Sequence, residues 1–134
     1  MTTSQPEPQV LTQQDGAVRT LTLNRPKALN SFTTSMHAEL LAALNVAADD
    51  ASVRCVVITG AGRGFCAGQD LSDPAIAPKM VDGQMLPAAE QPDIGALIEA
   101  CYRPLALRVQ SMPVPVIAPK MVDGQMLPAA EQPD

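Results

Sequence analysis

Residues 55–71 read CVVITGAGRGFCAGQDL, a run rich in β-branched residues that leads directly into a glycine-rich turn. The run at 55–59 predicts a short buried strand, because branched side chains pack well on a pleated surface. The glycines that follow let backbone N–H groups approach a ligand closely, since glycine adopts conformations that other residues avoid. A tight turn with no ligand would have the same composition, so the residues alone leave both interpretations open.

Two elements before this stretch predict its setting in the fold. Residues 18–23 alternate between polar and apolar side chains, which is typical of a strand with one buried face. Apolar residues then recur at helical spacing up to Asp49, and Thr33 or Thr34 can cap the start of that helix through its hydroxyl. Strand, helix and strand in succession favour an α/β fold in which both faces of the strand at 55–59 are buried.

The N-terminal side of this unit has fewer regular features. Residues 1–9 are polar and predict a flexible leader, and residues 10–12 predict a short strand that turns at residues 13–16. His37 lies off the apolar stripe of the predicted helix, so we expect its side chain to be solvated.

The C-terminal side is rich in proline, which fixes the backbone and removes a hydrogen-bond donor. It predicts a loop that extends to about Asp93, followed by a helix whose apolar residues run from Ile94 to Leu105. Pro104 falls inside that helix and should kink it or split it in two. Residues 113–117 predict one more strand.

An identical repeat interrupts this pattern. Residues 76–93 and 117–134 share every letter of the string IAPKMVDGQMLPAAEQPD. Structural repeats normally share a pattern and not every residue, so a recent duplication or an artefact of the sequence explains the identity better than a solenoid does. We therefore divide the chain into a leader at 1–9, one domain at 10–117 and a disordered duplicate of the loop at 118–134. A two-repeat interaction module is the alternative.

The composition restricts the kinds of partner. The chain has 134 residues, a net charge of −5 and only three aromatic side chains, Phe32, Phe65 and Tyr102. Nucleic-acid binding needs a cationic surface and usually rings for stacking, so we expect no nucleic-acid partner. No apolar run reaches the roughly 20 residues that cross a bilayer, and the first residues lack the pattern of a signal peptide. We therefore expect a cytoplasmic protein with no membrane partner.

Several catalytic and cofactor motifs do not occur in the sequence. Gly60 and Gly62 begin a dinucleotide fingerprint, but Phe65 replaces its last glycine, and there is neither a P-loop nor a G-x-S-x-G motif. A single histidine argues against a hydrolase triad. The cysteines are odd in number and widely spaced, so we expect neither disulfides nor a metal site.

Two strings resemble the signatures of the enoyl-CoA hydratase/isomerase (crotonase) superfamily. The first is LNRPKALNS at 23–31, and the second is VVITG at 56–60 leading to RGFCAGQDL at 63–71. Their order and their separation by one amphipathic helix also match. The resemblance covers residues 10–117 and implies a crotonase-like spiral of β-β-α units. Within the family, the run at 59–71 is most similar to the branch of phenylacetate catabolism that isomerises ring 1,2-epoxyphenylacetyl-CoA.

The resemblance also implies where a substrate is held. In this family two backbone N–H groups bind the thioester oxygen and stabilise the enolate that forms, and by motif the first belongs to Gln69. Coenzyme A is then part of the acyl-CoA substrate, and no separate cofactor is expected. Asp70 is interpreted as a turn or cap carboxylate in preference to a directly catalytic one, and Lys27 either meets a phosphate or is an ordinary surface lysine. The residues that the resemblance places around coenzyme A are Arg25, Lys27, Ala28, Leu29, Ala67, Gly68, Gln69, Asp70 and Leu71.

The family pattern breaks off after residue 117. Complete members continue with a glycine- and alanine-rich segment that supplies the second N–H, and with the acidic residues that move protons. Here the duplicated loop follows instead, so we expect a truncated domain without the second donor and the catalytic acid. The chain is then either an isomerase or hydratase, or a non-catalytic fragment that at most binds acyl-CoA. Complete members form trimers or hexamers, an assembly that the shortened chain puts in doubt.

Overall fold

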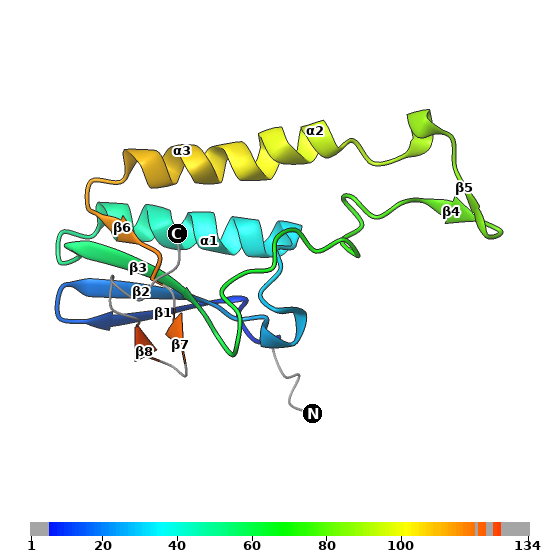
Figure 1. Cartoon of the computed structure of the whole chain (residues 1–134). Helices are drawn as coiled ribbons and strands as arrows, with labels where there is room; N and C mark the ends of the chain where they lie inside the picture. Colours follow the sequence, from blue (N-terminus) through cyan, green and yellow to red (C-terminus); the bar gives the residue numbers. More distant parts are fainter. Residues whose placement is uncertain (1–5, 120, 123–124, 127–134) are drawn as a thin grey trace, which may run out of the picture.

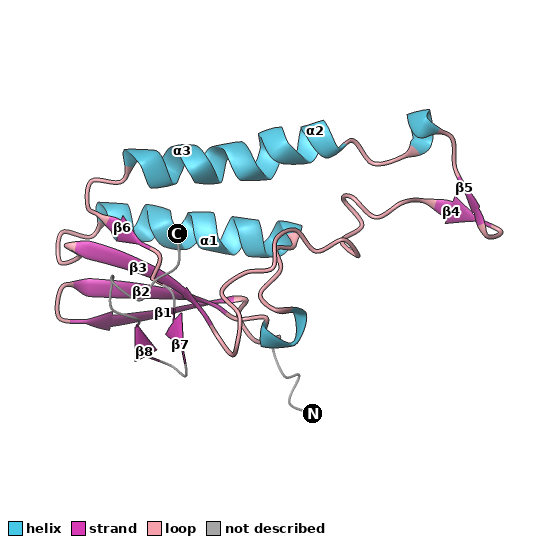
Figure 2. Cartoon of the chain, in the orientation of Figure 1, coloured by secondary structure: helices cyan, strands magenta, loops and turns pink. Residues whose placement is uncertain are grey.

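A four-stranded sheet with the strand order β1-β2-β3-β6 forms the centre of the computed structural model, which describes residues 6–119, 121–122 and 125–126. β1 (Val10–Asp15) is antiparallel to β2 (Val18–Leu23). β3 (Cys55–Gly60) runs parallel to β2, and β6 (Val116–Ile117) runs parallel to β3. The described helices lie on one face of this sheet, as Figures 1 and 2 show.

The first hairpin is longer than the sequence predicts. All six residues of β1 pair with β2 as far as Asp15, and Gly16 then makes the turn with a φ of +58°. The predicted turn at 13–16 is therefore correct at Gly16 and wrong for residues 13–15, because ladder hydrogen bonds keep these polar residues in the strand with their side chains exposed. On β2, Leu21 and Leu23 are buried, as the alternation predicts.

The helix α1 (Thr34–Asp49) provides the other half of the core. Thr33 caps it, since its Oγ1 accepts a hydrogen bond from the Met36 backbone N–H at 3.2 Å. The predicted cap, apolar stripe and strand-helix-strand order are confirmed. The buried core consists of Val10, Leu21, Leu23, Met36, Leu40, Leu44, Ala47, Val53, Val56 and Ile58.

The two faces of β3 differ in burial. Val56 and Ile58 belong to the buried core, whereas Val57 and Thr59 on the opposite face are only half-buried. The prediction that both faces are buried is therefore wrong for the second face, because the described helices cover the sheet from one side.

The second helical segment changes its hydrogen-bonding register without a gap. α2 (Ile94–Leu97) leads into a π-helical turn, η3 (Ile98–Tyr102), and then into α3 (Arg103–Ser111). Pro104 has no N–H to donate, and a widened turn just before it accommodates that missing hydrogen bond. These three elements, called the rod below, lie alongside α1 (Figure 1).

Residues 74–93 project from the body as an arm, which Figure 1 shows extending away from the sheet. The arm is more than the loop that the sequence predicts. It contains β4 (Met80–Val81) paired with β5 (Gln84–Met85), and the 3-10 turn η2 (Ala88–Glu90). The Asp-Gly pair between β4 and β5 has φ values of +53° and +76°, which are the positive angles that a two-residue hairpin turn requires.

The duplicated segment contains the same two strands, since β7 (Met121–Val122) pairs with β8 (Gln125–Met126). The predicted disorder of 118–134 stays a prediction, because most of these residues lie outside the described part of the chain. The same holds for the predicted flexibility of 1–9, of which residues 1–5 are not described.

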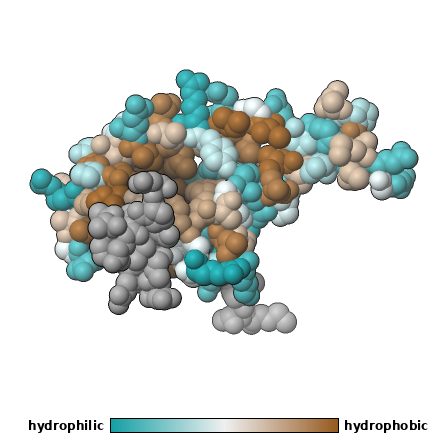
Figure 3. Space-filling view, in the orientation of Figure 1, coloured by the Kyte–Doolittle hydropathy of each residue, from teal (hydrophilic) through white to brown (hydrophobic). Residues whose placement is uncertain are grey.

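The surface of the rod is partly apolar. Ile94, Ile98 and Leu107 are 57%, 48% and 52% exposed, and Figure 3 shows apolar side chains gathered over α2 and its neighbouring turn. No helix in the described residues is long and apolar enough to cross a membrane. Ile94, Ile98 and Leu107 thus form an exposed apolar surface on the rod.

Candidate functional site

A buried asparagine ties the glycine-rich turn to the segment after β2. Asn30 is fully buried, and its Nδ2 donates to the backbone carbonyls of Ala61 at 2.9 Å and Gly64 at 2.8 Å. Its Oδ1 accepts a hydrogen bond from the Arg25 backbone N–H at 2.8 Å. Both amide donors are thus used, and the φ of +57° at this position is one that asparagine tolerates better than most residues.

The end of β3 packs too tightly against the following turn for any side chain at Gly60. A Cβ built there would lie 2.4 Å from the Phe65 carbonyl oxygen and 2.5 Å from that of Gly64. The backbone of the turn cannot withdraw without breaking its hydrogen bonds to Asn30. Glycine at this position therefore allows the turn to fold back onto the strand.

The segment that contains Gln69 pairs with Phe32 like a very short parallel strand. The Phe32 N–H donates to the Gly68 carbonyl at 2.7 Å, and the Asp70 N–H donates to the Phe32 carbonyl at 2.8 Å. In this pattern Phe32 bonds the residues on either side of Gln69, so the N–H of Gln69 itself is not used. The N–H groups of Gly68 and Gln69 donate to no acceptor in the described residues.

The Asp70 carboxylate holds this segment in place through hydrogen bonds and an ion pair. Its Oδ1 accepts hydrogen bonds from Ser72, from Oγ at 2.6 Å and from the backbone N–H at 2.9 Å. Its Oδ2 forms an ion pair with Arg25 Nη2 at 2.9 Å. The hydrogen bonds from Ser72 and then Arg25 lower the pKa of Asp70 to about 2. These contacts agree with the interpretation of Asp70 as a turn carboxylate.

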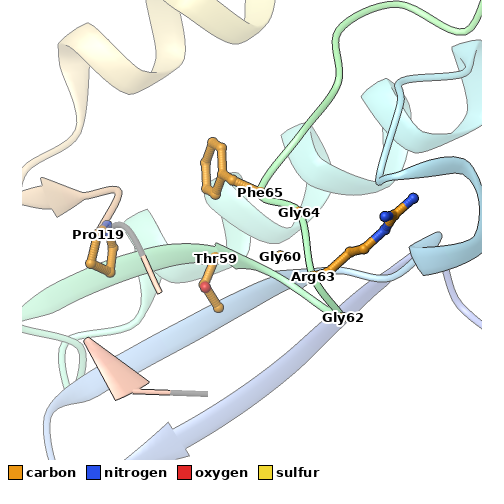
Figure 4. Close-up of a pocket in the computed structure, with 7 residues that line it drawn as sticks. All are labelled: Thr59, Gly60, Gly62, Arg63, Gly64, Phe65 and Pro119. Carbon is orange, nitrogen blue, oxygen red and sulfur yellow. The ribbon is translucent and has the colours of Figure 1, made fainter. Parts of the chain in front are cut away.

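Hollows in the surface border these loops. One, of about 260 Å³, lies next to the end of β3 and is lined by Thr59, Gly60, Gly62, Arg63, Gly64, Phe65 and Pro119 (Figure 4). A second, of about 330 Å³, is lined by Leu29 and residues 63–67. A third, of about 340 Å³, is lined by Glu7, Asn24, Arg25, Pro26, Lys27 and Ala28. The Arg63 side chain in Figure 4 extends away from Thr59 and Pro119.

The residues predicted around coenzyme A fall into three groups. Leu29 and Ala67 line the second hollow, and Arg25, Lys27 and Ala28 line the third. The remaining predicted residues, Gly68, Gln69, Asp70 and Leu71, lie on the adjoining loop and line neither of these two hollows.

Sequence reasoning missed Arg63 and Asn30. Arg63 lines two of the hollows, is exposed, and forms no ion pair within the described residues. Its place between two glycines of the turn is the signal that could have identified it. Asn30 belongs to the first signature string, but its contacts to residues more than thirty positions away appear only in the structure.

The prediction that the His37 side chain is solvated is wrong. Its side chain is buried, and its ring lies between those of Phe32, at a centroid distance of 4.5 Å, and Tyr102, at 4.3 Å. The helical periodicity of α1 gives no sign of this burial, because η3 and the Phe32 loop cover His37 from outside the helix. Burial lowers the pKa of His37, while Gln69 and Asp73 act in the opposite direction.

Comparison with known proteins identifies the family. Residues 13–129 match the sequence model of enoyl-CoA hydratase/isomerase. The chain belongs to this family. This enoyl-CoA hydratase/isomerase domain has the α/β, crotonase-like fold that its two signature strings imply.

Curated relatives and solved structures support this assignment. The 1,2-epoxyphenylacetyl-CoA isomerase of Escherichia coli (strain K12) is 46% identical over 104 residues, 78% of this chain and 36% of that protein. A probable enoyl-CoA hydratase of Rhodobacter capsulatus is 38% identical over 94 residues, 70% of this chain and 31% of that protein. The chain therefore spans about a third of the length of these curated relatives.

Two solved enoyl-CoA hydratases are similar to this chain in fold. The one from Mycobacterium smegmatis has a TM-score of 0.65 at 38% identity and covers 84% of this chain and 39% of its own. The one from Mycobacterium marinum has a TM-score of 0.62 at 35% identity, with 83% of this chain and 47% of its own covered.

Proposed function

We propose that this chain provides the acyl-CoA-binding part of a crotonase-type isomerase or hydratase, with the backbone N–H of Gln69 as a donor to the thioester oxygen. The observation that carries the proposal is the unused N–H of Gln69 between two hydrogen bonds to Phe32. A donor held in place before reaction stabilises an enolate oxygen without reorganising, and one such donor contributes about 3–4 kcal/mol in enzymes of known mechanism.

The substrate that we propose is a phenylacetyl-CoA ring epoxide, which the enzyme would isomerise. Its support is the 46% identity to the isomerase of Escherichia coli. A 2-enoyl-CoA is the second candidate, supported by the solved relatives, which are enoyl-CoA hydratases. A backbone donor serves any thioester, because it binds the carbonyl oxygen that all thioesters share and not the variable part of the acyl chain.

Coenzyme A phosphates need cationic partners, and the loops around the site offer two. Lys27 and Arg63 are exposed and form no ion pair among the described residues. The Arg25 guanidinium, in contrast, is engaged with Asp70 and Ser31. We therefore propose Lys27 and Arg63 as phosphate contacts, and Arg25 as a residue that holds the loop.

Binding without turnover is the alternative function. The carboxylates next to the Gln69 segment are Asp70 and Asp73, and both accept several hydrogen bonds. These bonds lower the pKa of each carboxyl group, which makes it a weak base. The described residues thus offer a donor for the thioester, but the two carboxylates next to that donor are both occupied by hydrogen bonds.

Calorimetric titration of the 134-residue chain tests the proposal. We expect crotonyl-CoA and phenylacetyl-CoA to bind about tenfold more tightly than free coenzyme A, which corresponds to roughly 1.4 kcal/mol from a carbonyl hydrogen bond. Equal affinities for all three ligands, or no binding, would refute it. Chromatographic assay of crotonyl-CoA and of the epoxide then separates an enzyme from a binding protein.

Substitution of Gln69 isolates the donor. Gln69→Pro removes an N–H that makes no hydrogen bond in the described residues, whereas Gln69→Ala removes only the side chain. We expect Gln69→Pro to abolish the preference for acyl-CoA over coenzyme A, and Gln69→Ala, which keeps the N–H but loses the side chain, to retain only part of it. Loss of the preference in both variants would instead assign it to the side chain.

A further inference from the structure

The loop that carries the Gln69 N–H has little support of its own. Gly68 has a φ of +110°, and a Cβ placed there would meet no atom within 4 Å. Glycine also permits many backbone conformations, so it cannot fix the direction of the following N–H. Contacts from elsewhere in the molecule must therefore hold Gln69. The backbone pairing with Phe32 is one of them.

The second contact reaches Gln69 through its side chain. The Tyr102 hydroxyl, on η3, donates a hydrogen bond to Gln69 Oε1 across 33 positions of sequence. The Nε2 atom of Gln69 is also buried, so the whole side-chain amide is enclosed by protein. Burial also raises the pKa of Tyr102, which keeps its hydroxyl protonated and able to donate.

A stack of rings in turn holds Tyr102. The His37 ring meets the Tyr102 ring edge-on at 4.3 Å and the Phe32 ring at 4.5 Å. Phe32 is the residue whose backbone pairs with the Gln69 segment. The stack therefore links both supports of Gln69, the backbone pairing and the Tyr102 hydroxyl, in one packed unit.

We infer that Tyr102 is a positioning residue for the Gln69 N–H, and that the His37 ring keeps Tyr102 in place. This inference rests on the proposed function of Gln69 as a thioester donor. Tyr102 acts through Gln69 and does not itself contact the substrate. It fixes the Gln69 side chain, and the fixed side chain limits rotation of the peptide that bears the N–H.

Nuclear magnetic resonance of the full chain tests this inference without any ligand. We expect the ¹⁵N heteronuclear NOE values of the Gln69 and Asp70 amides to be similar in the wild type, and that of Gln69 to fall well below that of Asp70 in Tyr102→Phe. Glu99→Gln is the matched control, since Glu99 lies on the same rod and, within the described part of the chain, forms its ion pair with exposed Arg103. An unchanged Gln69 amide in a folded Tyr102→Phe variant would overturn the inference.

A double-mutant cycle separates positioning from general loosening. Gln69→Met keeps the N–H and the length of the side chain but removes the acceptor of the Tyr102 hydroxyl. We expect Tyr102→Phe, Gln69→Met and the double variant each to weaken phenylacetyl-CoA binding by about fivefold, because all three lose the same hydrogen bond. Free coenzyme A should bind equally to all of them. Additive losses in the double variant would contradict the inference.

The infrared stretching frequency of the bound thioester carbonyl reports directly on its hydrogen bond to the Gln69 N–H. A Tyr102 that only stabilised the fold would not affect this frequency. With a ¹³C-labelled carbonyl, we expect the lowered stretching frequency of the bound wild type to return toward its free value in Tyr102→Phe. Glu99→Gln, the control on the same rod, should leave both the spectrum and the Gln69 amide unchanged. If the wild type binds no acyl-CoA, the proposed function fails, whereas the NMR comparison still decides the role of Tyr102.

Discussion

Asn30 connects three backbone groups that belong to two loops, and its replacement shows what a single side chain contributes. Asn30→Ala leaves two carbonyls and one N–H without their partner in a buried place. We expect the free energy of unfolding to fall by about 3 kcal/mol, as measured by urea denaturation.

Asn45→Ala is the control for this substitution, because Asn45 is exposed on α1. Its free energy of unfolding should change by no more than about 0.5 kcal/mol. If both variants lose the same amount of stability, the hydrogen bonds of Asn30 do not hold the two loops together.

Burial of His37 predicts a pH dependence of stability. Its pKa is lowered from 6.5 in the folded chain, so the unfolded chain takes up a proton first as the pH falls. The free energy of unfolding should therefore decline as the pH falls from about 7 through 6.5, until the pKa of the folded state is passed. Urea midpoints between pH 7.5 and about 5 measure this decline, which His37→Phe should remove.

The aspartates affect the free energy of unfolding in a separate and more acidic pH range. The pKa values of Asp50, Asp70 and Asp73 are lowered from 3.8, so the stability that they provide is complete above that value. It is lost only as the pH falls below 3.8 and, for Asp70, through about 2. A decline between pH 7 and about 5 that persists in His37→Phe would show that another group is responsible.

Among the elements, the arm has one side chain, that of Gln91, that joins its two ends. Gln91 Oε1 accepts from the Lys79 N–H at 2.8 Å, and its Nε2 donates to the carbonyls of Lys79 at 3.1 Å and Leu86 at 2.8 Å. We expect Gln91→Ala to speed tryptic cleavage after Lys79 several-fold, because the segment opens more often. The fragment that ends at Lys79, followed by mass spectrometry, gives the rate.

The urea midpoint should stay the same in Gln91→Ala, since the arm shares little of the buried core. Glu90→Ala, at an exposed neighbouring position, should change neither the midpoint nor the cleavage rate. Equal cleavage of wild type and Gln91→Ala would mean that other contacts keep the hairpin closed.

Local patterns in the sequence predicted the elements whose partners are near in sequence or follow a simple period. The alternation at Leu21 and Leu23 and the stripe of α1 are of this kind. The hairpin at residues 80–85 was missed, although its Asp-Gly pair is a strong turn signal. The tyrosine that reaches Gln69 could not be predicted, because this contact depends on where two distant elements meet.

At the scale of the whole molecule, the rod presents apolar side chains that the described residues leave uncovered. We expect the chain to associate with itself as its concentration rises, because exposed apolar surface is buried most readily against another copy. Ile98→Glu should lower the average mass measured by light scattering, since Ile98 is 48% exposed on this surface.

Gln110→Glu introduces the same charge at an exposed position of α3 and should leave the average mass unchanged. A monomeric wild type at all concentrations would contradict the prediction. The chain spans 36% of its Escherichia coli relative. In a polypeptide of that length, the additional residues could cover the apolar surface of the rod in place of a second copy.

The same hairpin register occurs twice in this chain, with Met80 opposite Met85 and Met121 opposite Met126. One copy stands in the arm before the rod, and the other follows β6, so their neighbours along the chain differ. Identical pairing in two different surroundings means that the residues of the segment themselves encode the hairpin. It should therefore be transferable, and a loop of an unrelated protein could receive it as an insertion without redesign.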